Sequence, residues 1–245
     1  MYFPLLPVIK HLVEEKFMSP ETTSFGWAGG EPSILKELNE GYALLLKSVK
    51  RIIFSTNAVV FSDVIYRNLG KENVAETFIK SSIDAGTADK YKEIRGRDFF
   101  DRAFDNLQKY AERSPQTVYA KYIVLTENCN LREIRSFIKQ VYSRNIKRVI
   151  ISSDYARWSI PARHWAALET LFAGLKSKGI EVVFTHHLMS VINAADAEKV
   201  PAILYSGYMD YDCPTCWPSE SRKAQQGSSA KNMASSKRIA LEMNS

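Results

Sequence analysis

The sequence predicts an α/β fold in which parallel strands alternate with helices, and two observations carry this prediction. Short runs of apolar and β-branched residues recur along the chain, and the segments between them have apolar residues at helical spacing. This alternation is typical of parallel strands joined by right-handed helical crossovers. It fits a βα barrel or a doubly wound sheet and does not choose between them.

Six segments are predicted to be strands, because each is a short apolar or β-branched run bounded by polar or turn residues. They are residues 24–28, 51–57, 78–84, 118–125, 148–153 and 181–185. Helical spacing is clearest over residues 100–111 and 131–142. The chain opens with a helical pattern over residues 5–17 and with no strand before it, so the first parallel unit lacks its strand.

Capping residues mark the ends of two of the predicted helices. Asn130, followed three residues later by Glu133, predicts a helix N-terminus. Pro161 suits a first helical position, and Gly179 suits the end of the same helix. These signals place helices directly after the fourth and fifth predicted strands.

Length and composition indicate one domain large enough for an enzyme. The chain has 245 residues, of which 45% are hydrophobic, so it can bury a sizeable core. We expect a core over residues 1–190 and a C-terminal extension with a CxxC pair over residues 191–217. Residues 218–245 are rich in Ser, Lys, Ala and Gln and are predicted to be a disordered tail.

Charge and hydropathy bear on partners and location. The net charge of +6 is spread over short clusters separated by acidic residues, which indicates a solvated surface rather than a nucleic-acid site. No apolar run approaches the roughly 20 residues needed to span a bilayer. The N-terminus also lacks the basic start of a signal peptide. We therefore expect a cytoplasmic protein with neither a membrane nor a nucleic-acid partner.

The segment Gly29-Gly30-Glu31-Pro32 follows the first predicted strand and is predicted to be a ligand-binding loop. Two adjacent glycines let backbone groups approach a small molecule, and Glu31 can accept a hydrogen bond from a cationic amine. Pro32 restricts the residue before it to extended geometry. The alternative interpretation is an ordinary turn.

Polar side chains gather near the ends of the next three predicted strands. Because alternate side chains of a strand share a face, Lys80, Ser82 and Asp84 are expected to lie together. The same rule aligns Ser55 with Asn57, and it places Lys121 on the face of Tyr119 and Ile123. Buried polar groups need partners, so this cluster either satisfies itself inside a barrel or binds a ligand.

These segments carry a family resemblance. Gly29-Gly30-Glu31-Pro32, then 55–58 (Ser-Thr-Asn-Ala) and then 82–86 (Ser-Ile-Asp-Ala-Gly), in this order, resemble the radical S-adenosylmethionine (radical SAM) superfamily. Residues 91–100, leading to Asn106-Leu107, further resemble members with SPASM-like C-terminal extensions, which modify peptides, sugars or other small substrates. The resemblance covers about residues 5–187. It implies a partial (βα)6-type TIM-like barrel with outer helices, from which the first strand is missing.

The resemblance also implies a function and a set of site residues. Members bind SAM and use a [4Fe-4S] cluster to generate a 5'-deoxyadenosyl radical that abstracts hydrogen from a substrate, with a flavodoxin or ferredoxin as the expected reductant. Gly29, Gly30, Glu31 and the adjoining Pro32 would hold the SAM amino group. The residues implied for the SAM carboxylate or ribose are Ser55, Asn57, Ser82, Asp84 and Lys121. Those implied for an apolar wall beside adenine are Val149, Ile150 and Ile151.

The sequence departs from the family at the cluster. Its three-cysteine CxxxCxxC motif, which follows the first strand, is absent, so the primary cluster ligands are expected upstream of Met1. The sequence would then be a fragment or have a misassigned start; the alternative is a SAM-binding relic without radical chemistry. Cys213 and Cys216 have the spacing of a metal site, auxiliary cluster or zinc knuckle, although two thiolates are too few alone. Cys129 could join them, or be a small buried residue.

Two further alternatives stay open. His186-His187 at the end of the last predicted strand suits a metal or acid–base role, or a pair of rim histidines without chemistry. The Gly29-Gly30 loop could instead bind a phosphorylated metabolite in a barrel enzyme of another class. Competition by SAM, and not by nucleotides or sugar phosphates, would separate these functions.

Overall fold

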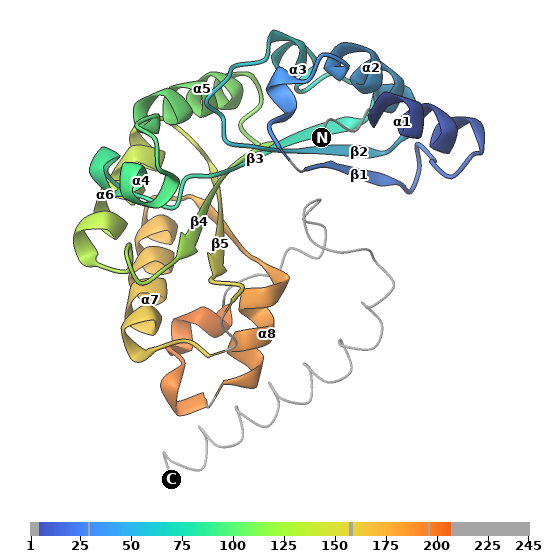
Figure 1. Cartoon of the computed structure of the whole chain (residues 1–245). Helices are drawn as coiled ribbons and strands as arrows, with labels where there is room; N and C mark the ends of the chain where they lie inside the picture. The colour runs from blue at the N-terminus through green and yellow to red at the C-terminus, as the bar shows by residue number, and fades with distance from the viewer. Residues whose placement is uncertain (1–4, 29, 157–158, 196, 207–245) are drawn as a thin grey trace.

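The structure, a computed structural model, describes residues 5–28, 30–156, 159–195 and 197–206 and contains one curved, all-parallel sheet (Figure 1). The six strands are β1 (Ser24–Trp27), β2 (Arg51–Thr56), β3 (Glu76–Ser82), β4 (Val118–Val124), β5 (Arg148–Ser153) and β6 (Glu181–Phe184). They lie in the order β1-β2-β3-β4-β5-β6. A doubly wound sheet reverses its strand order, so this sequential order identifies a partial TIM-like barrel. All six predicted strands are confirmed.

Helices cover the outside of the curved sheet, as Figure 1 shows for α2 to α7. The helices are α1 (Leu5–Glu14), α2 (Leu38–Ser48), α3 (Asp63–Asn68), α4 (Ala88–Arg95), α5 (Phe100–Arg113), α6 (Leu131–Ser143), α7 (Ala162–Ser177) and α8 (His186–Ala194). Three short 3-10 segments are η1 (Pro32–Ile34), η2 (Ala197–Lys199) and η3 (Ala202–Ser206). The predicted alternation gave no bounds for α2, α3, α4 and α8; in α3, α4 and α8, six to nine residues give too few repeats of a helical pattern.

The predicted helix start at Asn130 and the predicted helix end at Gly179 are confirmed. The Asn130 side chain accepts a hydrogen bond from Glu133 N at 3.0 Å and starts α6. Gly179, just after α7, has a positive φ of 68°, which suits a glycine at a helix end. Pro161 is the residue before α7 rather than its first helical residue.

The two faces of the sheet bury different apolar clusters. One large cluster packs between the sheet and the outer helices. A separate small cluster lies on the concave face and consists of Ile53, Phe78, Tyr119, Ile150 and Val183. Ile151 belongs to the large cluster and is 0% exposed, so its side chain does not form the wall for adenine that we expected. Alternate residues point to opposite faces, and Ile150 is the one on the concave face.

Ion pairs join the first residues of neighbouring strands. The guanidinium of Arg148 donates two hydrogen bonds to Glu181, at 2.9 and 2.8 Å, and one to the Tyr119 hydroxyl at 2.5 Å. Arg51 and Glu76, the first residues of β2 and β3, pair at 3.5 Å. Together with the small concave cluster, these pairs fill the amino half of the curve, so a ligand is expected at the carboxyl ends.

The core extends beyond the expected boundary at residue 190. That boundary falls inside α8, and both Val200 and Leu204 are buried in the same large cluster as the strands. The CxxC residues Cys213 and Cys216, and the tail over 218–245, lie outside the described residues. Within the described ranges, no helix is long and apolar enough to cross a membrane.

Candidate functional site

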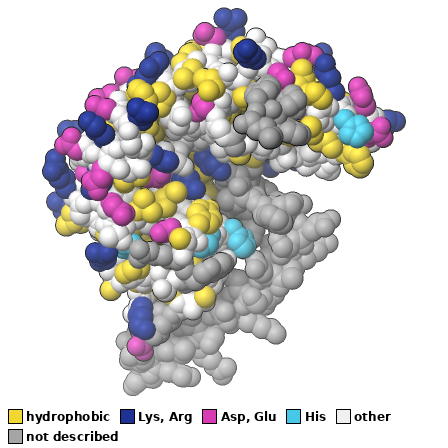
Figure 2. All heavy atoms as spheres, in the orientation of Figure 1, with side chains coloured by type: hydrophobic (Ala, Val, Ile, Leu, Met, Phe, Trp, Pro, Cys, Tyr) yellow, Lys and Arg dark blue, Asp and Glu magenta, His cyan; other side chains and the backbone are white. Residues whose placement is uncertain are grey.

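Polar side chains form a ring on the carboxyl half of the concave face. Each lies two residues after a member of the small apolar cluster. Ser55, Lys80, Lys121 and Ser152 are on the neighbouring strands β2 to β5, and Thr185 directly follows β6. The first three are half-buried, and the last two are buried and joined by a hydrogen bond of 3.1 Å. Figure 2 shows that the described part of the molecule is hollowed on the side of the sheet opposite the outer helices. Of the predicted polar cluster, Ser55, Lys80 and Lys121 lie together on this face, whereas Ser152 and Thr185 were not part of the prediction.

Hydrogen bonds to Glu31 join the loop after β1 to the end of β2. Its carboxylate accepts hydrogen bonds from the Thr56 hydroxyl at 2.6 Å, from Asn57 N at 2.8 Å and from Ser33 N at 3.1 Å. Gly30 has a positive φ of 89°, and a Cβ there would meet no atom within 4 Å. Gly29 lies outside the described residues, and Pro32 is a buried residue of η1. Glu31 thus orients an open backbone segment at the rim of the site.

The turn after β2 has a support that the sequence did not reveal. Asn106, from α5, is buried and donates a hydrogen bond to the Ala58 carbonyl at 2.8 Å. Ala58 has a positive φ of 57°, and the side chain of Asn57 accepts from Val59 N at 2.8 Å. A polar residue on the apolar face of a predicted helix is the signal that could have identified Asn106.

The side chain of Asp84 does not lie on the strand face that the sequence predicted for it. Its φ of +56° turns the backbone, and its carboxylate accepts a hydrogen bond from Ile123 N at 2.7 Å and pairs with Arg95. Arg95 also donates to the Ser82 carbonyl at 2.7 Å. The carboxylate therefore takes the place of a β3 carbonyl in the ladder to β4. A contact of Asp84 with ribose stays a prediction, and both of its oxygens already have protein partners.

Burial dominates the protonation of Asp84. The side chain is 2% exposed, and this desolvation raises the pKa of its carboxyl to about 6. Arg95, the Ile123 N–H and the Lys121 ammonium each favour the charged form and limit the rise in pKa. The group therefore titrates close to physiological pH rather than well below it.

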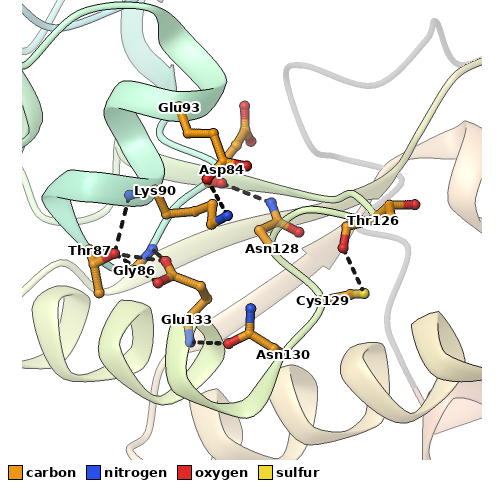
Figure 3. A network of polar contacts seen from close by, with 10 residues as sticks. All are labelled: Asp84, Gly86, Thr87, Lys90, Glu93, Thr126, Asn128, Cys129, Asn130 and Glu133. Carbon is orange, nitrogen blue, oxygen red and sulfur yellow. Dashed lines mark hydrogen bonds and ion pairs between the residues drawn. The ribbon is translucent and has the colours of Figure 1, made fainter.

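The loops after β3 and β4 are joined by a network that Figure 3 shows from close by. Asn128, which is 0% exposed, donates to the Asp84 carbonyl and to the Ile123 carbonyl, each at 2.8 Å. Glu133 accepts from Gly86 N at 2.8 Å and from the Thr87 hydroxyl at 2.7 Å. The Glu133 carboxylate therefore binds the start of α4 instead of reaching back to its own cap.

A second cluster of polar and aromatic side chains lies at the carboxyl ends of β4 to β6. The Lys121 ammonium lies 5.2 Å from the ring centroid of Tyr155, and that ring lies 4.7 Å from the ring of His187. The Ser153 hydroxyl is 3.0 Å from His187 Nδ1. His186 is exposed, and its ring lies 3.4 Å from the Ser190 hydroxyl. The predicted histidine pair is thus divided between the interior and the surface.

Comparison with solved structures identifies the fold. Over 70% of this chain and 40% of the other, SuiB from Streptococcus suis bound to S-adenosylmethionine is similar with a TM-score of 0.54 and 13% identity. The chain has the fold of a radical SAM core domain. At such low identity the likeness shows the fold alone.

Two further structures share this radical SAM fold. SuiB bound to its precursor peptide SuiA matches with a TM-score of 0.54 and 12% identity, over 79% of this chain and 45% of SuiB. A domain of a pyruvate-formate lyase-activating enzyme from Bacteroides vulgatus matches with a TM-score of 0.51 and 13% identity, over 66% of this chain and 98% of that domain. The chain therefore spans less than half of SuiB. No protein-family model and no curated protein matches the sequence.

The radical SAM fold does not by itself supply a metal site here. Within the described residues, no group of three or more His, Cys, Asp or Glu side chains could hold a metal ion. Cys129 lies at the rim, where its thiol donates to the Thr126 carbonyl at 3.3 Å. The predicted auxiliary site at Cys213 and Cys216 is outside the described part of the chain and stays a prediction.

Proposed function

We propose that this chain is the SAM-binding core of a radical SAM enzyme. The observation that supports the proposal is the pairing of an open glycine loop with a polar ring at the carboxyl ends of a radical SAM fold. A SAM-bound structure of SuiB, a protein with this fold, adds to that support. In parallel α/β folds these strand ends are where ligands bind.

The residues near β1 to β3 fit the methionyl part of SAM. The backbone at Gly30 is open to a ligand, and the negative charge of Glu31 beside it favours the cationic amino group. We assign Gly29, Gly30 and Glu31 to this amino group, with Pro32 fixing the loop. Polar side chains suited to the carboxylate or ribose are Ser55, Asn57 and Ser82. Lys121, half-buried on the neighbouring strand in register with Ser82, is the cation suited to the SAM carboxylate.

The chemistry of such an enzyme needs an iron–sulfur cluster. A [4Fe-4S] cluster would supply the electron that cleaves SAM to a 5'-deoxyadenosyl radical, which abstracts hydrogen from a substrate. The described residues do not fit the cluster, since they offer no metal-binding group. The role we propose for this chain is therefore to bind SAM, orient it and exclude water. A flavodoxin or ferredoxin as reductant and a cytoplasmic location are parts of the same proposal.

Isothermal titration calorimetry with SAM tests the binding proposal. Gly30→Ala should weaken SAM affinity about tenfold or more, because a Cβ would block the approach of the ligand to the backbone. Gly179→Ala is a matched control: Gly179 has a similar positive φ of 68° and no atom within 4 Å of its Cβ position, but it precedes β6 at the amino end. Equal SAM affinities for the two variants would contradict the site.

Reductive cleavage tests the enzyme part of the proposal. After anaerobic reconstitution with iron and sulfide, release of 5'-deoxyadenosine from SAM on dithionite reduction would mean that residues outside the described ranges, where Cys213 and Cys216 lie, complete a cluster. SAM binding without iron uptake would instead favour the non-catalytic SAM-binding module. Displacement of SAM by nucleotides or sugar phosphates would favour the phosphorylated-metabolite enzyme, because those ligands would then share the glycine loop.

A further inference from the structure

The exposed face of α6 carries basic side chains and no acidic one. Arg132, Arg135 and Lys139 are all exposed, and their spacing of three and four residues places them on one face of the helix. The one acid of α6, Glu133, is 4% exposed and accepts hydrogen bonds from Gly86 N and the Thr87 hydroxyl. The carboxylate of α6 is therefore turned away from its exposed cations.

Two exposed apolar side chains lie on the same face. Leu131 is 52% exposed and Tyr142 is 56% exposed, and the helical period places both beside Arg135. The Lys178 ammonium, at the end of α7, lies over the Tyr142 ring at 5.1 Å. The name α6 basic face is used below for Leu131, Arg132, Arg135, Lys139 and Tyr142, which together extend about 17 Å along the helix.

The charges of the α6 basic face do not stabilise the helix. Like charges three or four residues apart repel each other, and cations near a helix N-terminus oppose the helix dipole. Arg132 and Arg135 lie in the first two turns of α6, which begins at Leu131. Within the described residues, neither they nor Lys139 form an ion pair. A contribution to the stability of the fold therefore does not explain these three cations.

The neighbouring helix α5 shows the charge balance of an ordinary solvated surface. Its exposed acids are interleaved with its exposed bases, and these side chains are Asp101, Arg102, Asp105, Lys109, Glu112 and Arg113. Mixed charges of this kind are typical of a helix face in contact with water. Among the helices that the structure describes, only α6 combines three exposed cations with no exposed acid.

We propose that the α6 basic face docks an acidic segment of a partner protein. Carboxylates of the partner would pair with Arg132, Arg135 and Lys139, and its apolar side chains would contact Leu131 and Tyr142. Charge complementarity selects partners of the opposite sign, and arginine and tyrosine are enriched where proteins bind one another. The face lies on the outer side of the sheet (Figure 1), so docking there leaves the concave face free and is independent of the proposed function.

The surroundings of the α6 basic face favour a protein over a nucleic acid. At the C-terminal end of α6, Arg144 pairs with the exposed Asp101 and Asp105 of α5, at 3.7 and 3.2 Å. A nucleic acid has a negative charge on every phosphate, and these carboxylates would repel it. A protein segment can instead place its acids on the cations alone and its apolar side chains on Leu131 and Tyr142.

Fluorescence anisotropy with a labelled helical peptide tests the proposal. The peptide presents glutamate and leucine side chains on one face, and its controls are the same peptide with glutamine for glutamate and a short duplex DNA. At about 0.15 M salt, the acidic peptide should bind the whole chain about tenfold more tightly than either control. The triple variant R132Q/R135Q/K139Q should weaken that binding about tenfold or more.

A matched triple variant on α5 controls for net charge. R102Q/K109Q/R113Q also removes three exposed cations, so it lowers the net charge of the protein by the same amount. It should retain the affinity for the acidic peptide within about twofold. Equal losses in the two triple variants would overturn the proposal, because the peptide would then respond to the overall charge of the protein and not to α6.

Arg135→Glu distinguishes docking from a structural role. A glutamate in this place would replace two repulsions, with Arg132 and with Lys139, by two attractions along the helix. The urea midpoint of unfolding should therefore rise while the affinity for the acidic peptide falls about tenfold or more. Loss of both stability and binding would overturn the proposal, since Arg135 would then support the fold.

The remaining outcomes concern the kind of partner. Duplex DNA that binds more tightly than the acidic peptide, and loses that binding in R132Q/R135Q/K139Q, would overturn the proposal in favour of a nucleic-acid surface. Failure of the acidic peptide to bind the whole chain would also overturn it. Leu131→Ser should weaken peptide binding several-fold, because the exposed leucine supplies apolar contact. An unchanged affinity would contradict the apolar part of the interface.

Discussion

Replacing Gly86 with alanine should destabilise the fold by about 3 kcal/mol or more. A Cβ at this position would overlap the carbonyl oxygen of Glu133 and lie 2.7 Å from Phe137 N, and both are backbone atoms of α6. Backbone atoms of a helix cannot move aside as the end of a flexible side chain can. The loop after β3 would have to withdraw, and the hydrogen bond from Gly86 N to Glu133 would be lost.

Urea unfolding of purified protein measures this effect, with Gly26→Ala as the control. Gly26 lies in β1, and a Cβ there would meet nothing within 4 Å. Its replacement should leave stability unchanged or slightly raised, because alanine restricts the unfolded chain more than glycine does. Equal stabilities of the two variants would show that α6 and the β3–α4 loop are not in close contact.

Asp84 should make the stability of the fold fall as the pH rises toward neutrality. Burial raises the pKa of its carboxyl to about 6, above the value of the unfolded chain, despite Arg95 and the Ile123 N–H. The native state therefore holds this proton more tightly than the unfolded state does. Below about pH 4 this proton stabilises the folded state by roughly 3 kcal/mol. The stabilisation is lost as the pH rises through about 6.

Other carboxyl groups titrate in the same range, so the contribution of Asp84 is taken against Asp84→Asn. Asparagine tolerates the positive φ of 56° and can still accept from Ile123 N. Urea unfolding from about pH 4 to about pH 7 should show the wild-type protein losing roughly 2 to 3 kcal/mol relative to Asp84→Asn. Arg95→Gln should raise the pKa of Asp84 further and move the loss to higher pH.

A difference between wild type and Asp84→Asn that grows in favour of the wild type with rising pH would refute this prediction. It would mean that the ion pair with Arg95, which is 35% exposed, outweighs burial and lowers the pKa of Asp84. The two outcomes have opposite signs, so an experiment of modest precision distinguishes them.

The local sequence pattern was sufficient to predict the strands and several helix ends. The strands β2 to β6 are short apolar runs because their middle residues are buried on both faces, which leaves a continuous hydrophobic signal. The capping by Asn130 and the left-handed Gly179 depend only on neighbours in the chain, so sequence predicts them well. The polar residues two positions beyond the concave apolar cluster also follow from the strand period.

Departures from strand geometry were not visible in the pattern. Asp84 continues the alternation of Lys80 and Ser82 in the sequence, but its positive φ takes its carboxylate into the ladder with Ile123. The sequence suggested Val149, Ile150 and Ile151 alike for the wall beside adenine, whereas of these three the register places Ile150 on the concave face. A shift of one residue reverses the face of every side chain, so short apolar runs do not fix it.

The sequence by itself determined the alternation of strands and helices, the glycine loop and the resemblance to radical SAM proteins, because these depend on residues close together in the chain. Only the tertiary structure chose the sequential strand order over a doubly wound one, and only it tied Glu31 to Thr56 and Lys121 to Tyr155. Those partners are separated by many residues, and a single sequence carries no signal for which distant polar groups meet. Burial and sheet register decide it once the chain has folded.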